Sequence, residues 1–167
     1  MSIFLIGMPG VGKSTLGVIL AKQLGYDFID ADLVIQRREQ KRLPEIIAQE
    51  GIDAFLKLEN EVCCSLAGIS DTVIATGGSA VYGAEAMKMF SEKGTVVYLK
   101  ASLGTLRARL RDLKGRGGVL RNGQTLEDIY EERTRLYEKY AGLVIDEDGK
   151  TLEQTLDAVL EAVSGNS

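Results

Sequence analysis

The stretch Gly7-Met8-Pro9-Gly10-Val11-Gly12-Lys13-Ser14 matches the pattern G-x-x-x-x-G-K-[ST] and determines how the rest of the chain is interpreted. It directly follows the apolar run Ile3-Phe4-Leu5-Ile6 and opens a segment with helical periodicity, which is the order of strand, loop and helix that the motif needs. Glycines let the backbone adopt positive φ and bring successive N–H groups and a helix N-terminus close to an anion. The stretch therefore predicts a phosphate-binding loop.

The side chains of this loop indicate a nucleoside triphosphate with Mg²⁺. Lys13 adds a positive charge at the β- and γ-phosphates, and Ser14 offers a hydroxyl to Mg²⁺, which prefers oxygen ligands. A GTPase needs Asn-Lys-x-Asp to bind guanine, and no Asn in this chain is followed by Lys, so ATP is the expected nucleotide. The residues expected to bind it here are Gly10, Val11, Gly12, Lys13, Ser14 and Thr15.

Short apolar, β-branched runs alternate with helical patterns along the whole chain, which is typical of a parallel α/β sheet with helices on both faces. The predicted strands are 3–6, 28–29, 72–75, 95–99 and 143–145. The predicted helices are 13–24, 33–38, 43–49, 54–66, 84–93, 103–113, 125–140 and 152–163. The sequence contains no internal repeat and no linker-like segment. We therefore expect residues 1–167 to form one layered domain.

Composition excludes several functional classes. The 167 residues are 45% hydrophobic and 26% charged, as in a folded globular domain, and they include no histidine and no tryptophan. A Ser-His-Asp triad, a histidine-based zinc site and a histidine general base are therefore impossible. The net charge of -4 lacks the positive surface typical of a nucleic-acid partner, so a small molecule is expected.

The cysteines and the N-terminal segment indicate the cellular compartment of the protein. Cys63 and Cys64 are adjacent, which favours neither a disulfide framework nor a cysteine metal site. The first apolar run is shorter than a signal-peptide core and is broken by Gly7 and Pro9. We therefore expect a cytoplasmic protein without a membrane partner.

Two carboxylates follow the second predicted strand, in Asp30-Ala31-Asp32. The carboxyl ends of parallel strands form the ligand-binding edge of an open α/β sheet, so both side chains can face the phosphates. One carboxylate can anchor Mg²⁺, and the other can orient an attacking hydroxyl or accept its proton. The alternative is that Asp32 only caps a helix beginning at Leu33.

One further segment, 114–124, interrupts two helical patterns with four glycines and three basic residues. It predicts a mobile, basic loop, which in a phosphoryl-transfer enzyme would close over the substrates.

Over nearly its whole length the sequence resembles the shikimate kinases. The resemblance is carried by the phosphate loop and by Asp30-Ala31-Asp32, Phe55-Leu56, Gly77-Gly78-Ser79, Arg116-Gly117-Gly118-Val119-Leu120 and Arg133-Thr134-Arg135-Leu136-Tyr137. It implies a three-layer α/β/α P-loop NTPase fold with a five-stranded parallel sheet, similar to nucleoside monophosphate kinases. The lid would span about 114–124 and the substrate-binding helices about 33–66. The implied activity is transfer of the γ-phosphoryl group of ATP to a hydroxyl of shikimate, in aromatic amino acid biosynthesis, by a monomer.

The resemblance also implies roles for individual residues. Ser14 and Asp30 would serve Mg²⁺, while Lys13, Asp32 and Arg116 would be catalytic. The residues that would bind the substrate are Asp32, Gly77, Gly78, Ser79 and Arg133, the last at the substrate carboxylate. Arg116 would close over ATP from the lid, and Arg109 would lie along the adenine, the alternative for Arg109 being a solvated helix charge.

The departures from the family pattern fall on the acceptor pocket and the lid. Leu56 stands where the family has arginine, so one charge-assisted pair with a substrate carboxylate is lost, and Lys57 points about 100° away from it. Ser79 replaces the third glycine, and Arg135 replaces a proline. These changes leave two alternatives open: a kinase for another small hydroxylated metabolite, or a nucleotide-binding module without turnover.

Overall fold

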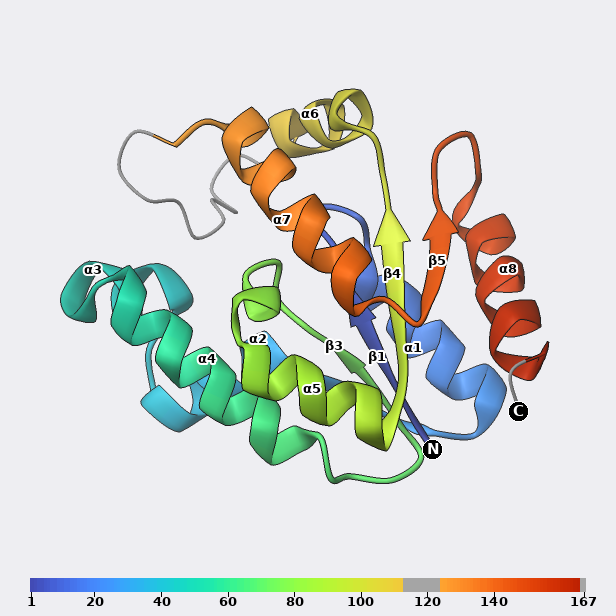
Figure 1. The fold of residues 1–167 in the computed structure, drawn as a ribbon, viewed down its shortest axis with the longest axis horizontal. Helices are drawn as coiled ribbons and strands as arrows, with labels where there is room; N and C mark the ends of the chain where they lie inside the picture. The colour runs from blue at the N-terminus through green and yellow to red at the C-terminus, as the bar shows by residue number, and fades with distance from the viewer. Residues whose placement is uncertain (113–123, 166–167) are drawn as a thin grey trace.

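The computed structural model describes residues 1–112 and 124–165, which fold around a five-stranded, fully parallel sheet with the strand order β2-β3-β1-β4-β5 (Figure 1). The strands are β1 (Ser2–Ile6), β2 (Asp27–Asp30), β3 (Thr72–Ala75), β4 (Gly94–Lys100) and β5 (Leu143–Asp146). All five coincide with the apolar runs of the sequence, which confirms the predicted parallel sheet.

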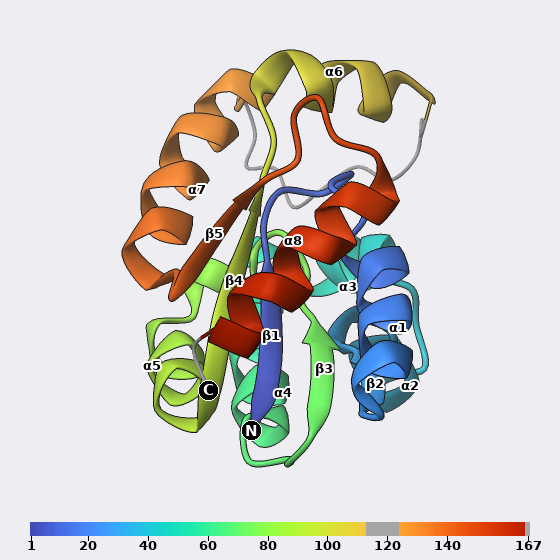
Figure 2. The same ribbon diagram turned by 90° about the vertical axis from the view of Figure 1, so that its right-hand side faces the viewer.

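Helices form the outer layers. They are α1 (Lys13–Leu24), α2 (Ala31–Glu39), α3 (Leu43–Glu50), α4 (Ile52–Leu66), the 3-10 helix η1 (Ala80–Tyr82), α5 (Ala84–Lys93), α6 (Leu103–Asp112), α7 (Leu126–Tyr140) and α8 (Leu152–Gly165). Figure 2 shows α1 and α8 on one face of the sheet and α4 and α5 on the other. The architecture is therefore the expected α/β/α sandwich.

The central strands are apolar because they are covered on both faces. Every residue of β1 and β3 is buried, as are the side chains of β4 from Val96 to Leu99. A parallel strand that is covered twice has no solvent side, so its sequence is a continuous hydrophobic run rather than an alternating one. This explains why the strands were predictable from the sequence.

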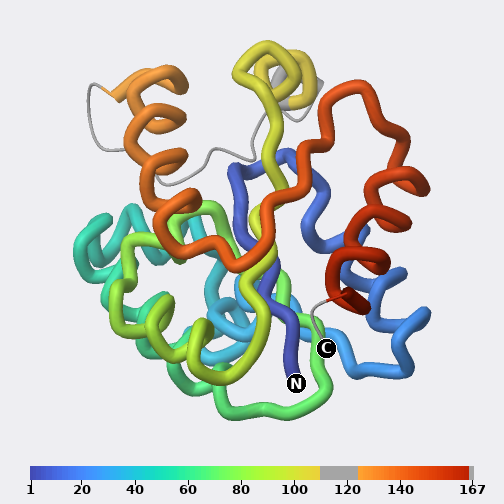
Figure 3. The backbone as a smooth tube through the Cα atoms, turned by 45° about the vertical axis from the view of Figure 1, so that its right-hand side comes forward, coloured from blue at the N-terminus to red at the C-terminus, as the bar shows by residue number. Residues whose placement is uncertain are grey.

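The strand register brings three connections to one level at the carboxyl edge. Leu5 of β1 and Asp30 of β2 both pair with Ala75 of β3. The phosphate loop, the segment after Asp30 and the glycines after Ala75 therefore leave the sheet side by side. Figure 3 follows the chain from Met1, at one end of the sheet, up β1 to the loop at residues 7–12, at the other.

Three helix starts differ from the predictions. Helix α2 begins at Ala31 rather than Leu33, α4 begins at Ile52 rather than Ala54, and α7 begins at Leu126 rather than Thr125. Residues 113–123 lie outside the described residues, and with them Arg116 and nearly all of the expected lid. Within residues 1–112 and 124–165, no helix is long and apolar enough to cross a membrane.

Candidate active site

The phosphate loop connects β1 to α1 through left-handed glycines. Gly10 has φ of 89° and Gly12 has φ of 77°, a conformation that residues with a Cβ rarely adopt. A Cβ on Gly7 would lie 2.6 Å from the carbonyl oxygen of Leu99, because the loop passes close to the end of β4. Gly12 caps α1 without any side chain, so the first N–H groups of this helix face the cavity.

Lys13 lies inside this loop. Its Nζ donates to the carbonyl oxygens of Gly7 at 2.6 Å and Met8 at 2.9 Å, and the residue is only 8% exposed. Burial lowers the pKa of Lys13 to about 8, and the nearby Arg133 acts in the same direction. A bound phosphate would favour the charged form of this lysine.

Ser14 and Asp30 are paired. The Ser14 hydroxyl donates to Asp30 Oδ2 at 2.7 Å, while Asp30 Oδ1 accepts from the backbone N–H groups of Asp32 and Leu33. Asp30, not Asp32, therefore caps α2, and the alternative that Asp32 is only a helix cap is wrong. A hydroxyl and a carboxylate beside a phosphate loop are ligands that Mg²⁺ accepts together with water and phosphate oxygens. No cluster of three or more metal-binding side chains occurs in the part of the chain that the structure describes.

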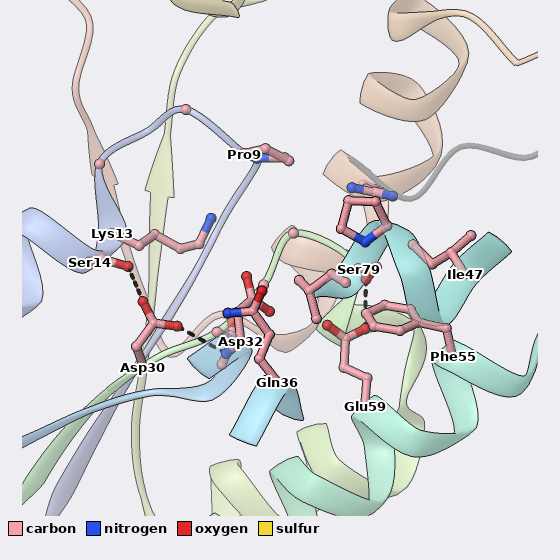
Figure 4. A pocket seen from close by; sticks show the side chains of 18 of the residues that line it. Pro9, Lys13, Ser14, Asp30, Asp32, Gln36, Ile47, Phe55, Glu59 and Ser79 are labelled. Atoms are coloured by element: carbon pink, nitrogen blue, oxygen red, sulfur yellow. Dashed lines mark hydrogen bonds between the residues drawn. The ribbon is translucent and has the colours of Figure 1, made fainter. Parts of the chain in front are cut away.

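Asp32 occupies the first turn of α2 and faces the cavity (Figure 4). Burial raises the pKa of Asp32 to about 6, the neighbouring Asp30 adds to the shift, and Lys13 opposes it. Such a carboxylate is ionised near neutral pH and basic enough to take a proton, which are the properties of a general base.

A cavity of about 700 Å³ contains these groups and has two halves. The nucleotide half consists of Pro9, Gly10, Gly12, Lys13, Ser14, Thr15 and Asp30. The acceptor half consists of Asp32, Gln36, Leu43, Pro44, Ile47, Phe55, Glu59, Thr76, Gly77, Gly78, Ser79 and Arg133. Asp32 lies where the two halves meet, with the phosphate loop on one side and the residues of α4 on the other (Figure 4).

The two glycines after β3 are required by close protein contacts. A Cβ on Gly77 would lie 2.6 Å from Asp32 Oδ1 and 2.9 Å from Glu59 Oε2. A Cβ on Gly78 would lie 2.6 Å from a Pro9 ring carbon. Any larger residue would displace the carboxylates or the phosphate loop, so both halves of the cavity depend on bare backbone here.

Glu59 is one of two buried carboxylates near the site that sequence reasoning missed. It is 2% exposed and accepts a hydrogen bond of 2.6 Å from the Ser79 hydroxyl. Burial raises the pKa of Glu59 to about 7. The sequence feature that could have identified Glu59 is its position four residues after Phe55, on the buried face of α4. A charged residue on a buried helix face needs a partner.

Arg133 is brought into the acceptor half from α7. It is 2% exposed, its Nε donates to the Tyr82 hydroxyl at 3.4 Å, and its guanidinium lies 5.5 Å from the centre of the Tyr82 ring. The Tyr137 hydroxyl, one turn later, donates to the Gly78 carbonyl at 2.5 Å. In contrast, Arg135 is exposed and Leu56 packs against the core, and neither is among the residues that line the cavity.

Arg109 lies against the phosphate loop. Its Nη1 donates to the Gly10 carbonyl at 3.1 Å and to Glu147 Oε1 at 3.4 Å. It is therefore more than a solvated helix charge. Glu147, which the sequence did not single out, is 7% exposed, and burial raises its pKa.

The sheet order, the phosphate loop after β1 and the carboxylates after β2 define a P-loop enzyme of the nucleoside monophosphate kinase type. Residues 9–164 match the family model for shikimate kinase. The chain is 36% identical over 181 residues to a shikimate kinase of Chlorobium phaeobacteroides, an alignment covering 99% of this chain and 95% of that protein.

Solved structures of shikimate kinases have the same fold as this chain. The shikimate kinase from Acinetobacter baumannii, in complex with shikimate, superposes with a TM-score of 0.91 at 30% identity, covering 99% of this chain and 94% of that one. The shikimate kinase from Aquifex aeolicus gives a TM-score of 0.84 at 31% identity, covering 99% and 98%. The chain belongs to the shikimate kinase family and is an ATP-dependent phosphotransferase that acts on a hydroxyl group.

Proposed function

We propose that this enzyme transfers the γ-phosphoryl group of Mg-ATP to a hydroxyl of shikimate and yields shikimate 3-phosphate. The observation that carries the proposal is the position of Asp32, a buried carboxylate between the phosphate loop and the acceptor half of one cavity. The close structural similarity to a kinase in complex with shikimate supports the choice of acceptor.

In the nucleotide half, the backbone N–H groups of the loop and Lys13 bind the phosphates of ATP. Ser14 and Asp30 would hold Mg²⁺, which when bound neutralises charge on the phosphates. Arg109 would lie along the adenine, and Arg116 would reach the phosphates from the lid. Gly10, Val11, Gly12 and Thr15 complete this half of the site.

In the acceptor half, Asp32 orients the attacking hydroxyl. An O–P bond forms between that hydroxyl oxygen and the γ-phosphorus, the bond from the γ-phosphorus to the bridging oxygen breaks, and ADP leaves with the electron pair. The hydroxyl proton passes to Asp32. Arg133 would meet the substrate carboxylate, and Gly77, Gly78 and Ser79 would line the other side.

We further propose a monomeric enzyme of the cytoplasm. Cys63 is a buried free thiol and Cys64 a half-buried one, as suits a reducing compartment.

A specific observation favours a second acceptor. Of the described residues that line the cavity, Lys13 and Arg133 are the only cations, and Lys13 bonds to the phosphate loop. The acceptor half thus offers one arginine to a carboxylate, where the family pattern offers two. A small polyol or hydroxy acid with a different anchoring group is the second candidate.

The experiment is an ADP-release assay with Mg-ATP, run with shikimate beside a panel of small hydroxy acids, sugar acids and hydroxy amino acids. Saturable turnover on shikimate, with half-saturation below about 1 mM as is usual for enzymes, supports the proposal. Turnover confined to another member of the panel supports the second candidate. Saturable nucleotide binding without transfer to any acceptor contradicts both and indicates a binding module.

A further inference from the structure

Glu147 is a buried carboxylate beside the phosphate loop that the roles assigned so far leave unused. It directly follows β5 and is 7% exposed. Two hydrogen bonds hold its backbone, because its N–H donates to the Lys100 carbonyl at 2.8 Å and its own carbonyl accepts from the Lys150 N–H at 3.1 Å. The Glu147 side chain therefore leaves the carboxyl edge of the sheet from a well-defined position.

One arginine neutralises this carboxylate by direct contact. Glu147 Oε1 accepts from Arg109 Nη1 at 3.4 Å, and within residues 1–112 and 124–165 no other group donates to either oxygen of Glu147. Burial raises the pKa of Glu147, whereas Arg109 and Lys13 lower it. A buried carboxylate without a partner is costly, so the charged form of Glu147 depends on Arg109.

The same nitrogen of Arg109 also bonds to the phosphate loop. Nη1 donates to the Gly10 carbonyl at 3.1 Å. This one group thus joins α6, the segment after β5 and the loop after β1, which Figure 2 shows together at one end of the sheet. A change at Glu147 therefore reaches the nucleotide half of the cavity through Arg109.

The two bonds orient the guanidinium of Arg109 and leave its flat face free. Guanidinium N–H groups lie in the plane of the group, so two acceptors at its edge fix the plane without covering the face. The Arg109 side chain is still 37% exposed although it has two partners. The face of an oriented guanidinium is a surface on which an aromatic base can stack.

We propose that Glu147 is a positioning residue, which holds Arg109 on the Gly10 carbonyl with the guanidinium face turned toward the nucleotide base. Glu147 then increases the affinity for adenine nucleotides. This role rests on the proposed place of Arg109 along the adenine. It does not involve the acceptor, so it applies whichever hydroxylated metabolite is phosphorylated.

The sign of the effect separates positioning from a simple charge effect. Glu147 carries a negative charge near a site for a polyanion, so a residue that acts only through its charge would repel the phosphates of ATP. Removing that charge would tighten ATP binding. If Glu147 positions Arg109, its removal weakens ATP binding instead, because the guanidinium loses one of its two acceptors and becomes less ordered.

The first test measures equilibrium binding of Mg-ATP without any acceptor. Affinity should fall about threefold in Glu147→Gln, which keeps an acceptor oxygen but loses the charge, and about tenfold in Glu147→Ala. The control is Glu153→Gln, which removes an exposed carboxylate in the first turn of α8 and should bind Mg-ATP as the wild-type enzyme does. Unchanged or tighter binding in both Glu147 variants would overturn the proposal.

Inorganic tripolyphosphate with Mg²⁺ tests whether the effect passes through the base. This probe can occupy the phosphate loop but offers no ring to Arg109. Its affinity should therefore stay within about twofold of the wild-type value in both Glu147 variants. Equal weakening of ATP and tripolyphosphate binding would show that the substitutions only disturb the phosphate loop, and this result would also overturn the proposal.

A third measurement separates Glu147 from the proposed place of Arg109. Arg109→Met should lower Mg-ATP affinity about tenfold, while Arg107→Met, the control, removes an exposed arginine of α6 that pairs with Glu127. In the Arg109→Met background, Glu147→Gln should no longer weaken ATP binding. Full ATP affinity in Arg109→Met would defeat the proposed place of Arg109. Additive losses from Arg109→Met and Glu147→Gln would defeat the positioning role alone.

Discussion

The two halves of the cavity differ in what they are made of. The nucleotide half is mainly backbone: glycines with positive φ, the uncapped start of α1, and Lys13 bonded to the carbonyl oxygens of its own loop. The acceptor half is mainly side chains, drawn from α2, α3, α4, α7 and the loop after β3. A backbone site is set by the fold, while a side-chain site can change one residue at a time.

The departures from the family pattern lie away from the phosphate loop. The phosphate loop, Ser14 and Asp30 fit the pattern throughout, whereas Ser79 departs from it within the acceptor half and Leu56 departs from it on α4, outside the residues that line the cavity. The Ser79 hydroxyl gives Glu59 a partner within the described structure. The substrate specificity of such an enzyme therefore depends on a few side chains around an unchanged phosphate loop.

The strongest separation of the two halves is expected at Asp32. In Asp32→Asn the side chain keeps its shape but cannot take the hydroxyl proton, so kcat should fall by about a thousandfold or more. ATP affinity should change little, because the phosphate loop is intact. Rapid-quench turnover and equilibrium nucleotide titration measure the two effects. Joint loss of both would contradict the role of Asp32.

Two glycines give a matched pair, one from each half. Gly77→Ala places a Cβ against the carboxylates of Asp32 and Glu59, so kcat should fall by about a hundredfold while ATP affinity is retained. Gly12→Ala meets no atom within 4 Å but is strained by its φ of 77°, so it should weaken ATP binding and lower stability by about 1 kcal/mol. Steady-state kinetics and thermal unfolding distinguish the outcomes, and equal effects of both variants on ATP would refute the separation.

The pH dependence of the free energy of unfolding tests the buried Glu59 carboxyl of the acceptor half. Because the pKa of Glu59 is about 7 in the folded enzyme and 4.5 in the unfolded chain, the folded state binds the proton more tightly. Stability is therefore lost as the pH rises from about 4.5 through 7. Glu59→Gln removes this loss, so it should be more stable than the wild-type enzyme by roughly 2 to 3 kcal/mol at pH 8 and nearly equal at pH 4. Urea unfolding at both pH values checks this, and a pH-independent difference would speak against it.

The smallest effect is expected from restoring the family arginine. Leu56→Arg should lower KM for shikimate by about tenfold with little change in kcat, since a charge-assisted pair with the carboxylate acts mainly on binding. Leu56→Gln, similar in length but uncharged, is the control. If the arginine and glutamine variants bind shikimate equally well, the acceptor carboxylate does not lie near this position.

How much the sequence predicts also differs between the halves. The strands followed from apolar runs, and the phosphate loop, Asp30 and Asp32 followed from a motif whose residues are close in sequence. Glu59 was missed because its hydrogen bond with Ser79 depends on how α4 packs against the loop after β3, which is a contact between distant segments.

Glu147 was missed for the same reason. It meets Arg109 across 38 residues, and neither side chain stands in a recognisable motif. The cap of α2 shows a subtler limit. Asp30 and Asp32 are both suitable caps, and the structure decides between them: Asp30 has an extended backbone, with φ of -98° and ψ of 114°, and its Oδ1 accepts from the N–H groups of Asp32 and Leu33.

The most direct measurement of the central claim is the product formed from Mg-ATP and shikimate by the wild-type enzyme and by Asp32→Asn, followed by ³¹P NMR. We expect one phosphate monoester of shikimate, formed in equal amount to ADP by the wild-type enzyme and undetectable on the same time scale with Asp32→Asn. ADP with free phosphate and no phosphorylated shikimate, or equal product from both enzymes, would contradict a kinase that acts through Asp32 on this acceptor.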